Sequence, residues 1–389
     1  MENKLTKQEI LINQAVEYFQ QGDHSLGYRI LLDAALHTDD VNVFKETLNF
    51  VALYENETQD KSTLEEDFLS CVTIIKNVPI EDKNVIGNTI LEGKSIVKEY
   101  NRGKFKLGPI DVTLKRGDIY GLVGENGNGK TTLLTILGSL IEKSSGSLSY
   151  SFLDATSDLY DLKSKLVYIP QRTSKWYGSV IDNLKFALVH HGVTGEKNHL
   201  LVHMMIARFG LWKYKDLKWS ELSSGYKMRF ELARTMLRKP EIVLLDEPLA
   251  NLDILAQQVI LEDLKMLAKS HVNPIAMIFS SQQLYEVEKV SDEVIYLRNG
   301  KPTDLLGINT DEENKLIIEL DTTNSREEIE KVFEEYDLEQ IEYNGGVYII
   351  YFKDNDITFN TVLSIIASNN FKIQYIRDIS KSTRRFFVY

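Results

Sequence analysis

The sequence predicts three parts of different fold class: an all-α N-terminal domain (residues 1–92), a central α/β domain (93–302) and a C-terminal α+β domain (303–389). Apolar residues recur every three or four positions in the first part. Short β-branched strands alternate with amphipathic stretches in the second part, and the third has the order β-α-β-β-α-β. A chain of 389 residues that is 43% hydrophobic is large enough for two or three such domains.

Four helices are expected in the N-terminal domain, over residues 5–21, 24–37, 39–56 and 63–77. Asp39 or Asp40 is placed to cap the third helix. The first two helices loosely resemble one tetratricopeptide hairpin, but no second copy follows about 34 residues later. Two interpretations stay open: a bundle that packs on its neighbour, and a module that regulates the chain or binds a protein partner. Residues 80–93 are expected to form a connection.

Five apolar strands are expected in the central domain, over residues 118–124, 165–170, 241–246, 275–280 and 293–298. Such runs are typical of strands buried in a largely parallel sheet. In the C-terminal domain, Asn344, Gly345 and Gly346 predict a hairpin between two strands. The flanking elements are a strand at 315–321, helices at 325–336 and 357–370, and a strand at 371–379, which is the order of a ferredoxin-like unit.

The net charge of −12 is unevenly distributed. Residues 1–92 hold 7 basic and 17 acidic residues, and residues 303–389 hold 9 and 17, so that the central domain is net positive. Either this pattern serves solubility, or it indicates that only the central domain binds a polyanion such as a nucleotide phosphate. The acidic flanks argue against nucleic-acid binding, which requires a basic face.

Several classes of protein are not expected from the composition. The single cysteine, Cys71, excludes an internal disulfide and a Cys-rich metal site. The sequence has no run of about 18 apolar residues that could span a bilayer. The first residues lack the pattern of a secretory signal, so a cytosolic location is expected.

The strongest motif is a phosphate loop that matches G-x-x-x-x-G-K-[ST], formed by Gly124, Glu125, Asn126, Gly127, Asn128, Gly129, Lys130 and Thr131. A predicted strand leads into it, and a helix that includes Thr132 leads out of it. The glycines allow backbone N–H groups to point at phosphate oxygens beside a helix N-terminus. Lys130 is expected to reach the β- and γ-phosphates, and the Thr131 hydroxyl to bind Mg²⁺.

Two further segments carry polar groups suited to nucleotide chemistry. The strand at 241–246 ends in Asp246 and Glu247, which we expect to hold Mg²⁺ and to position or deprotonate an attacking water, respectively. Ser223, Ser224 and Gly225 stand at the start of a predicted helix, where hydroxyl and N–H groups can bind an anion. In isolation this second segment indicates no more than a capped helix.

Taken in order along the chain, these segments resemble the ATP-binding-cassette (ABC) ATPase family over about residues 94–302. The resemblance implies a P-loop NTPase core that binds ATP and Mg²⁺. It places Tyr100, or as second choice Phe105, on the adenine ring. It places Gln171 where the family senses Mg²⁺ and the attacking water and communicates with a membrane subunit. It also implies that Ser223–Gly225 of one chain completes the site of a second chain, with residues 251–253 facing the dimer partner.

This sequence departs from the family pattern in the signature segment and at the switch position. Ser224 and Tyr226 replace a glycine and a glutamine of the usual LSGGQ, a variation that we expect to be tolerated. Gln282 stands where the family has a histidine. A neutral amide still donates a hydrogen bond, but one roughly half as strong as a charge-assisted bond. The hypothesis is therefore slow but real hydrolysis, with Glu247, Gln282 and Gln171 as the catalytic set.

The resemblance implies the ATPase subunit of a transporter, peripheral on the inner face of the membrane and dimeric around ATP, with separate permease subunits. A small C-terminal α/β appendage that ends in a short apolar segment, here residues 379–389, favours an exporter. The N-terminal helices are not part of that pattern, and we expect them to regulate the chain or recruit a partner. Two alternatives remain: a soluble cassette ATPase that acts on ribosomes or other machinery, and an ATP-gated interaction module.

Overall fold

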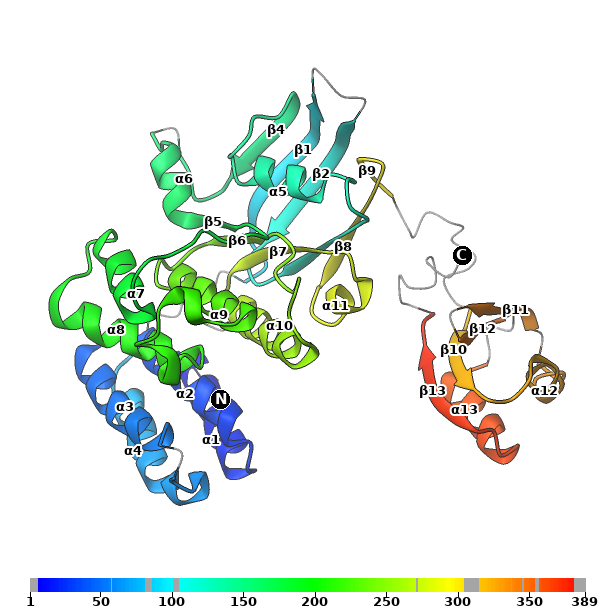
Figure 1. Cartoon of the computed structure of the whole chain (residues 1–389), viewed down its shortest axis with the longest axis horizontal. Helices are drawn as coiled ribbons and strands as arrows, with labels where there is room; N and C mark the ends of the chain where they lie inside the picture. Colours follow the sequence, from blue (N-terminus) through cyan, green and yellow to red (C-terminus); the bar gives the residue numbers. More distant parts are fainter. Residues whose placement is uncertain are drawn as a thin grey trace, which may run out of the picture. The chain divides into compact units, whose positions relative to one another are not determined.

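A computed structural model describes residues 6–380 except 57, 81–85, 101–104, 155, 271, 304–314, 337, 345 and 354–356. The chain divides into two compact units. Residues 1–282 and 289–301 form the first unit, and residues 283–288 and 302–389 form the second. The α/β core and the N-terminal helices therefore belong to one unit (Figure 1).

The four N-terminal helices are present as predicted: α1 Lys7–Gln20, α2 His24–Thr38, α3 Val41–Tyr54 and α4 Glu65–Lys76, the last preceded by a 3-10 turn at Lys61–Leu64. Of the two candidate caps, Asp40 caps α3 by accepting hydrogen bonds from the backbone of Asn42 and Val43. Stacked Phe19 and Phe68 rings, 4.1 Å apart, lie inside the bundle. The bundle thus has an aromatic core of its own.

A three-stranded antiparallel sheet, in the order β2-β1-β4, was not predicted. It consists of β1 Thr89–Glu99, β2 Lys106–Lys115 and β4 Ser145–Tyr150. Because β1 begins at Thr89, residues 89–93 of the expected connection at residues 80–93 are sheet. Residues 81–85 lie outside the described part of the chain.

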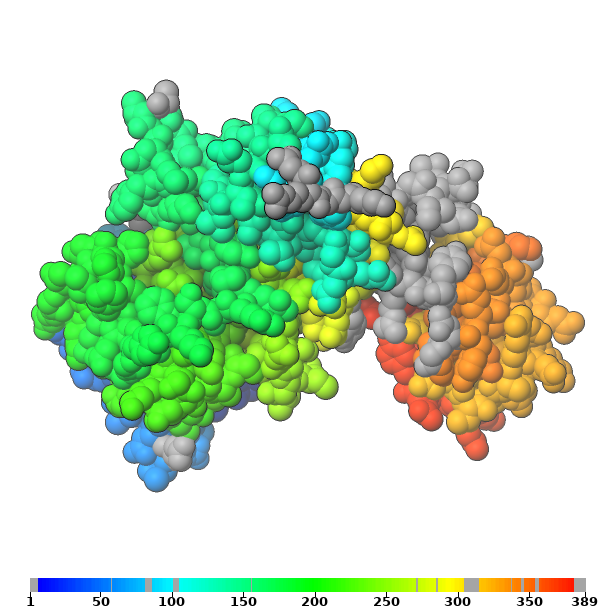
Figure 2. Space-filling model, turned by 45° about the horizontal axis from the view of Figure 1, so that its top comes forward, coloured from blue at the N-terminus to red at the C-terminus, as the bar shows by residue number. Residues whose placement is uncertain are grey.

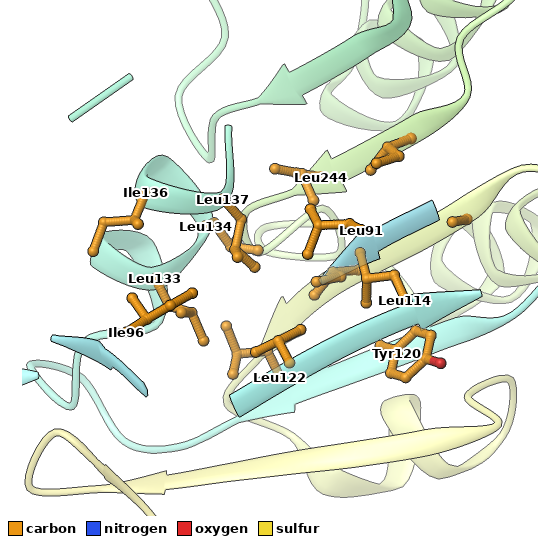
Figure 3. Close-up of a cluster of buried hydrophobic side chains, with 14 of the residues drawn as sticks. Leu91, Ile96, Leu114, Tyr120, Leu122, Leu133, Leu134, Ile136, Leu137 and Leu244 are labelled. Atoms are coloured by element: carbon orange, nitrogen blue, oxygen red, sulfur yellow. The ribbon is translucent and has the colours of Figure 1, made fainter. Parts of the chain in front are cut away.

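The predicted parallel sheet forms the centre of the first unit, in the order β5-β6-β7-β3-β8-β9. Its strands are β3 Ile119–Val123, β5 Leu166–Ile169, β6 Ile242–Leu245, β7 Ala276–Ser281, β8 Glu293–Arg298 and the short β9 Lys301–Pro302. The pairs among β3, β5, β6, β7 and β8 are parallel. The helix after the phosphate loop, α5 Lys130–Leu137, packs its leucines on the strands around Leu122 and Leu244 (Figure 3). This packing fixes the loop at the carboxyl end of β3.

A helical region follows β5 in the chain and precedes β6. It contains α7 Val180–Val189, α8 Gly195–Arg208 and α9 Ser224–Met236, whereas α6 Leu159–Lys165 comes immediately before β5 and α10 Ile254–Ala268 comes after β6. Helices α2 and α3 contact α8, so the N-terminal bundle lies against this region (Figures 1 and 2). The contact includes buried ion pairs, because Arg208 of α8 pairs with Asp33 of α2 at 2.6 Å and with Asp263 of α10 at 2.8 Å.

The second unit has the predicted ferredoxin-like arrangement. Strands β10 Ile317–Thr322, β11 Leu338–Asn344, β12 Val347–Phe352 and β13 Ile373–Asp378 form an antiparallel sheet in the order β11-β12-β10-β13. Helices α12 Arg326–Val332 and α13 Phe359–Ser368 cross over between strands, and the hairpin pairs Asn344 with Val347 as expected. Helix α11 Leu284–Glu288 also belongs to this unit. Of the apolar ending expected at residues 379–389, positions 381–389 lie outside the described residues.

Among the helices of the described residues, none is both long and apolar enough to cross a membrane.

Candidate functional site

The phosphate loop follows the buried strand β3 and ends at the first turn of α5. Gly127 and Gly129 have φ angles of +86° and +100°, which favour glycine. A side chain at Gly124 would stand 2.5 Å from the carbonyl oxygen of Leu297, so this glycine permits close packing against β8. The Asn128 side chain accepts a hydrogen bond from the Asn299 backbone at 2.9 Å. The loop conformation is therefore fixed by residues on both sides.

Lys130 is buried, with its side chain only 5% exposed. Its ammonium group donates to the carbonyl oxygens of Gly124 at 2.7 Å and Glu125 at 3.4 Å. It also lies 3.3 Å from a carboxylate oxygen of Glu247. The charge is thus held within the loop by acceptors that a phosphate oxygen could replace.

Asp246 brings the end of β6 to the phosphate loop. One of its carboxylate oxygens accepts hydrogen bonds from the Thr131 hydroxyl at 2.7 Å and the Tyr168 hydroxyl at 3.2 Å. The other oxygen accepts a bond from the Ser280 hydroxyl at 2.7 Å. Burial, and then the charge of Asp246, raises the pKa of Tyr168 well above its usual value, so Tyr168 stays a hydrogen-bond donor.

Glu247 is the point at which the predicted catalytic residues meet. Its carboxylate accepts hydrogen bonds from the amide of Gln171 at 2.7 Å and from the amide of Gln282 at 3.1 Å. Together with Lys130, three donors from three separate segments converge on this one group. The Glu247 backbone has a φ of +46°, an uncommon conformation for a residue with a side chain.

Two residues of this cluster were not predicted as site residues. Ser280 is fully buried in β7, donates to Asp246, and accepts the backbone N–H of Glu247 at 2.8 Å. Tyr168 lies on the neighbouring strand β5. Both stand near the carboxyl ends of apolar strands adjacent to β6, and a polar residue at that position of a parallel sheet is the available sequence signal.

The signature segment makes contacts elsewhere in the chain. Ser223 caps α9 by accepting a hydrogen bond from the Tyr226 backbone at 3.4 Å, and the Ser224 hydroxyl donates to the carbonyl of Asn251 at 2.9 Å. A side chain at Gly225 would stand 3.2 Å from Ala256 Cβ. Within the described part of the chain, these hydrogen bonds join Ser223 to Tyr226 and Ser224 to Asn251, and neither reaches the phosphate loop.

The two candidate adenine-stacking aromatics have different surroundings. Tyr100 is 44% exposed, and the Lys98 ammonium lies 5.5 Å from the centre of its ring. Phe105 is partly buried, and its ring would touch a side chain built at Gly129. Phe105 therefore lies next to the phosphate loop, while the Tyr100 ring is exposed and lies beside the Lys98 ammonium. Residues 101–104 between them lie outside the described residues.

The residues of this site fit a nucleoside triphosphate with magnesium. Among the described residues, no heavy atom outside Gly127 and its two chain neighbours lies within 4 Å of the position that a Gly127 Cβ would occupy, so the loop backbone is accessible there. The oxygens of Thr131 and Asp246, 2.7 Å apart, are of the kind that Mg²⁺ prefers. Lys130 would supply charge to the phosphates.

Comparison with known proteins agrees with this geometry. The family described as ABC transporter matches residues 107–250. The chain is 32% identical over 216 residues to the phosphate import ATP-binding protein PstB of Saccharolobus solfataricus, covering 52% of this chain and 82% of that protein. It is 30% identical over 213 residues to the spermidine/putrescine import ATP-binding protein PotA of Mesoplasma florum, covering 55% of this chain and 60% of that protein.

A third relative is the ABC transporter ATP-binding protein NatA of Bacillus subtilis, 26% identical over 49% of this chain and 78% of that protein. Among solved structures, cbiO1 of Clostridium perfringens, described as part of the ABC transporter complex cbiONQ, matches with a TM-score of 0.51 and 23% identity. That match covers 56% of this chain and 88% of the other. It shows the fold, and confirms the cassette core predicted from the sequence. The chain spans 60% of the length of the PotA relative.

Proposed function

The chain belongs to the family of ABC transporter ATP-binding proteins, and we propose that it binds and hydrolyses ATP to drive separate membrane subunits. The observation that carries the proposal is the convergence of Gln171, Gln282 and Lys130 on the Glu247 carboxylate. A carboxylate held beside a phosphate loop is placed to orient and deprotonate a water that attacks the terminal phosphate.

The other site residues take complementary roles in this proposal. Lys130 and the backbone N–H groups of residues 124–131, with Thr132 next in the helix, would hold the phosphates. Thr131 and Asp246 would hold Mg²⁺, which supplies charge neutralisation at the phosphates when bound, and Gln171 would sense it. Tyr100, with Phe105 as the second candidate, would support the adenine ring. Ser223, Ser224 and Gly225 would complete the site of a second copy; within the described part of the chain, the hydrogen bonds of Ser223 and Ser224 go to Tyr226 and Asn251.

Hydrolysis is proposed to be slow because Gln282 supplies a neutral amide where a histidine could supply a charged donor. Loss of about 1–3 kcal/mol of transition-state stabilisation corresponds to roughly 5- to 150-fold in rate. The contact of Gln282 with Glu247 supports a place for this residue beside the reacting water. Fast turnover of the purified chain that is unchanged in Gln282→Ala would contradict this part of the proposal.

The decisive experiment measures nucleotide binding and phosphate release by the full chain with Mg²⁺. The wild type is expected to bind ATP and release phosphate. Glu247→Gln keeps the size and hydrogen bonding of the side chain but removes the base, so it should bind ATP and release none. Lys130→Ala should lose binding. A wild type that takes up no nucleotide would overturn the proposal.

A second candidate function is an ATP-gated interaction module that hydrolyses weakly or not at all. It is favoured by Gln282, a neutral amide at the switch position, and by the N-terminal helices, which lie outside the residues 107–250 that match the ABC transporter family. Equal phosphate release by the wild type and Glu247→Gln, with ATP binding retained, would select this function.

The proposal extends to the binding partners of the chain and to its location. We expect a homodimer around two ATP molecules, separate permease subunits, and attachment to the inner face of the membrane through them. The sequence resemblance favours export, whereas the PotA and PstB relatives are named importers. Co-purification with a membrane subunit tests the partner, and transport into or out of reconstituted vesicles tests the direction.

The N-terminal helices are proposed to regulate the chain or to recruit a protein partner. Their contact with α8 and the pairing of Arg29 with Asp263 of α10 support regulation, because α8 and α10 follow Gln171 and Glu247 in the chain. Deletion of residues 1–80 should alter complex assembly or coupled activity. An unchanged complex with unchanged activity would contradict this role.

A further inference from the structure

The loop that follows Gln171 is fastened to helix α9 by a tryptophan. The indole N–H of Trp176 donates to a carboxylate oxygen of Glu231 at 3.0 Å. Glu231 is only 2% exposed, and its other oxygen accepts two hydrogen bonds from Arg234, at 2.9 and 2.7 Å. The Arg234 guanidinium lies 5.1 Å from the centre of the Trp176 ring, and the Phe230 ring packs edge-on at 6.1 Å.

This anchor is built from strong interactions. A buried carboxylate that accepts three hydrogen bonds, two of them from a guanidinium, is fixed in position. The Trp176 ring is held on one side by the cation and on another by an aromatic edge. Trp176 therefore has one orientation with respect to α9.

The loop has two further attachments, one at each end. At its start, Gln171 donates to Glu247 at 2.7 Å. At its end, the Trp219 backbone donates to the carbonyl of Gly178 at 3.2 Å, and the Val180 backbone donates to Leu217 at 2.9 Å. Only four residues, 172–175, separate Gln171 from the anchor. The position of the Gln171 amide is thus set by a short span whose far end moves with α9.

Helix α9 also carries the signature segment. Ser223 is its N-cap and Ser224 and Gly225 are in its first turn, about two turns from Glu231 along the same helix. A displacement of this helix shifts the Trp176 anchor by the same amount, because the side chains of Glu231 and Arg234 are packed against it.

We propose that Trp176 and Glu231 are positioning residues that hold Gln171 in hydrogen-bonding reach of Glu247 and make that reach depend on the position of α9. This inference deepens the proposed function and rests on it. Neither residue touches the reacting atoms, and both act through Gln171.

The test combines two readouts on the full chain. Trp176→Phe keeps the aromatic ring and removes only the N–H donor, and it leaves Glu231 paired with Arg234, so the fold is preserved. We expect it to lower kcat for ATP about three- to ten-fold with KM little changed. In a Gln171→Ala background the same change should have no further effect, since its consequence passes through Gln171. Trp212→Phe, at a tryptophan that packs on His203 and Lys215, is the matched control.

Backbone amide hydrogen exchange of residues 171–178 provides the readout that does not need turnover. Trp176→Phe should accelerate exchange in this segment and leave α9 protected, and Glu231→Gln, which weakens the pairing with Arg234, should act in the same direction. Unchanged exchange in both variants would overturn the inference, as would an equal fall in kcat with and without Gln171. If the wild type releases no phosphate, the proposed function fails, while the exchange result still decides whether the anchor holds the loop.

Discussion

At the scale of single residues, the Glu247 carboxylate concentrates the chemistry of this chain. Its three donors reach it from the phosphate loop, from the loop after β5 and from the end of β7. Of these donors only Lys130 carries a charge, since both glutamines are neutral amides. The electrostatic contribution at the switch position is consequently smaller than a protonated histidine would give.

Replacing the switch amide by a group that can be charged is expected to accelerate turnover. Gln282→His should raise kcat at saturating ATP by roughly 5- to 150-fold, the range that corresponds to about 1–3 kcal/mol of regained stabilisation. Steady-state phosphate release measures this. Gln283→His, at the next position, is the control for a general effect of histidine, and a rise of the same size there would contradict the assignment.

The Ser280 hydroxyl is expected to matter for both stability and magnesium. It is fully buried, donates to Asp246 and accepts from the Glu247 backbone. Ser280→Ala leaves both of these partners short of a hydrogen bond, so unfolding free energy should fall by about 1–3 kcal/mol. The Mg²⁺ concentration for half-maximal activity should rise as Asp246 loses its orientation. Tyr168→Phe, which removes a longer bond of 3.2 Å to the same carboxylate, should have the smaller effect.

The site residues differ in how far the sequence could reveal them. The sequence indicates phosphate and metal chemistry directly at two short segments. One is the phosphate loop, and the other is the pair Asp246 and Glu247 at the end of an apolar strand. Ser280 and Tyr168 could not be assigned in this way, because their roles depend on which strands flank β6 and on their register. The role of a hydroxyl at the end of an apolar strand can be inferred only once the strand that pairs with it has been identified.

At the scale of elements, the contact between the N-terminal bundle and the helical region depends on a buried ionic cluster. Arg208 pairs with Asp33 and Asp263, and Asp263 also accepts from Arg29 of α2 at 2.8 Å. Removing one member of such a cluster leaves its partner charged and buried. The sequence could not reveal this cluster, because its residues lie up to 234 positions apart in the chain.

A matched pair of aspartates tests this cluster. Asp33→Asn should lower the free energy of unfolding by about 3 kcal/mol, since Arg208 then keeps only one of its carboxylate partners. Asp39→Asn should cost at most about 1 kcal/mol, because Asp39 forms exposed pairs with Lys197 and Lys239. Its φ of +52° is one that asparagine tolerates. Denaturant titration of the full chain compares the two, and equal losses would contradict the buried role of Arg208.

His37, at the end of α2, makes the same interface sensitive to acid. Burial lowers the pKa of His37 below its ordinary value of 6.5, an effect to which Lys239 and Arg208 add and which Asp33 opposes. The folded chain therefore keeps this ring neutral while the unfolded chain binds a proton below about pH 6.5. Unfolding free energy should fall as the pH drops through that range, and His37→Gln should show a shallower fall. Parallel curves for the two proteins would contradict this expectation.

Elements with a single buried face were harder to predict than those buried on both sides. The strands of the parallel sheet are continuous apolar runs, and β3, β6 and β7 are buried at every position. In β4, by contrast, no residue is fully buried, and β1 is broken by shifts in register near Ser95. The alternation of buried positions in β2 was the one signal that could have revealed the antiparallel sheet.

At the scale of the whole molecule, the two units have separate hydrophobic cores. One core gathers α5 and the strands around it, including Leu122, Leu134 and Leu244 (Figure 3). The other gathers the sheet and helices of the ferredoxin-like unit around Phe333 and Phe352. Separate cores allow separate cooperative transitions, so a single unfolding temperature is not expected for this chain.

Nucleotide should stabilise only one of these transitions. Every residue proposed to hold ATP and Mg²⁺ lies in the first unit. A ligand at a hundred times its Kd adds about 2.7 kcal/mol to the unit that binds it and nothing to a unit that does not. Differential scanning calorimetry with and without MgATP should therefore show one transition that moves to higher temperature and one that stays. In Lys130→Ala neither should move, whereas a shift that persists in this variant would place the nucleotide outside the phosphate loop.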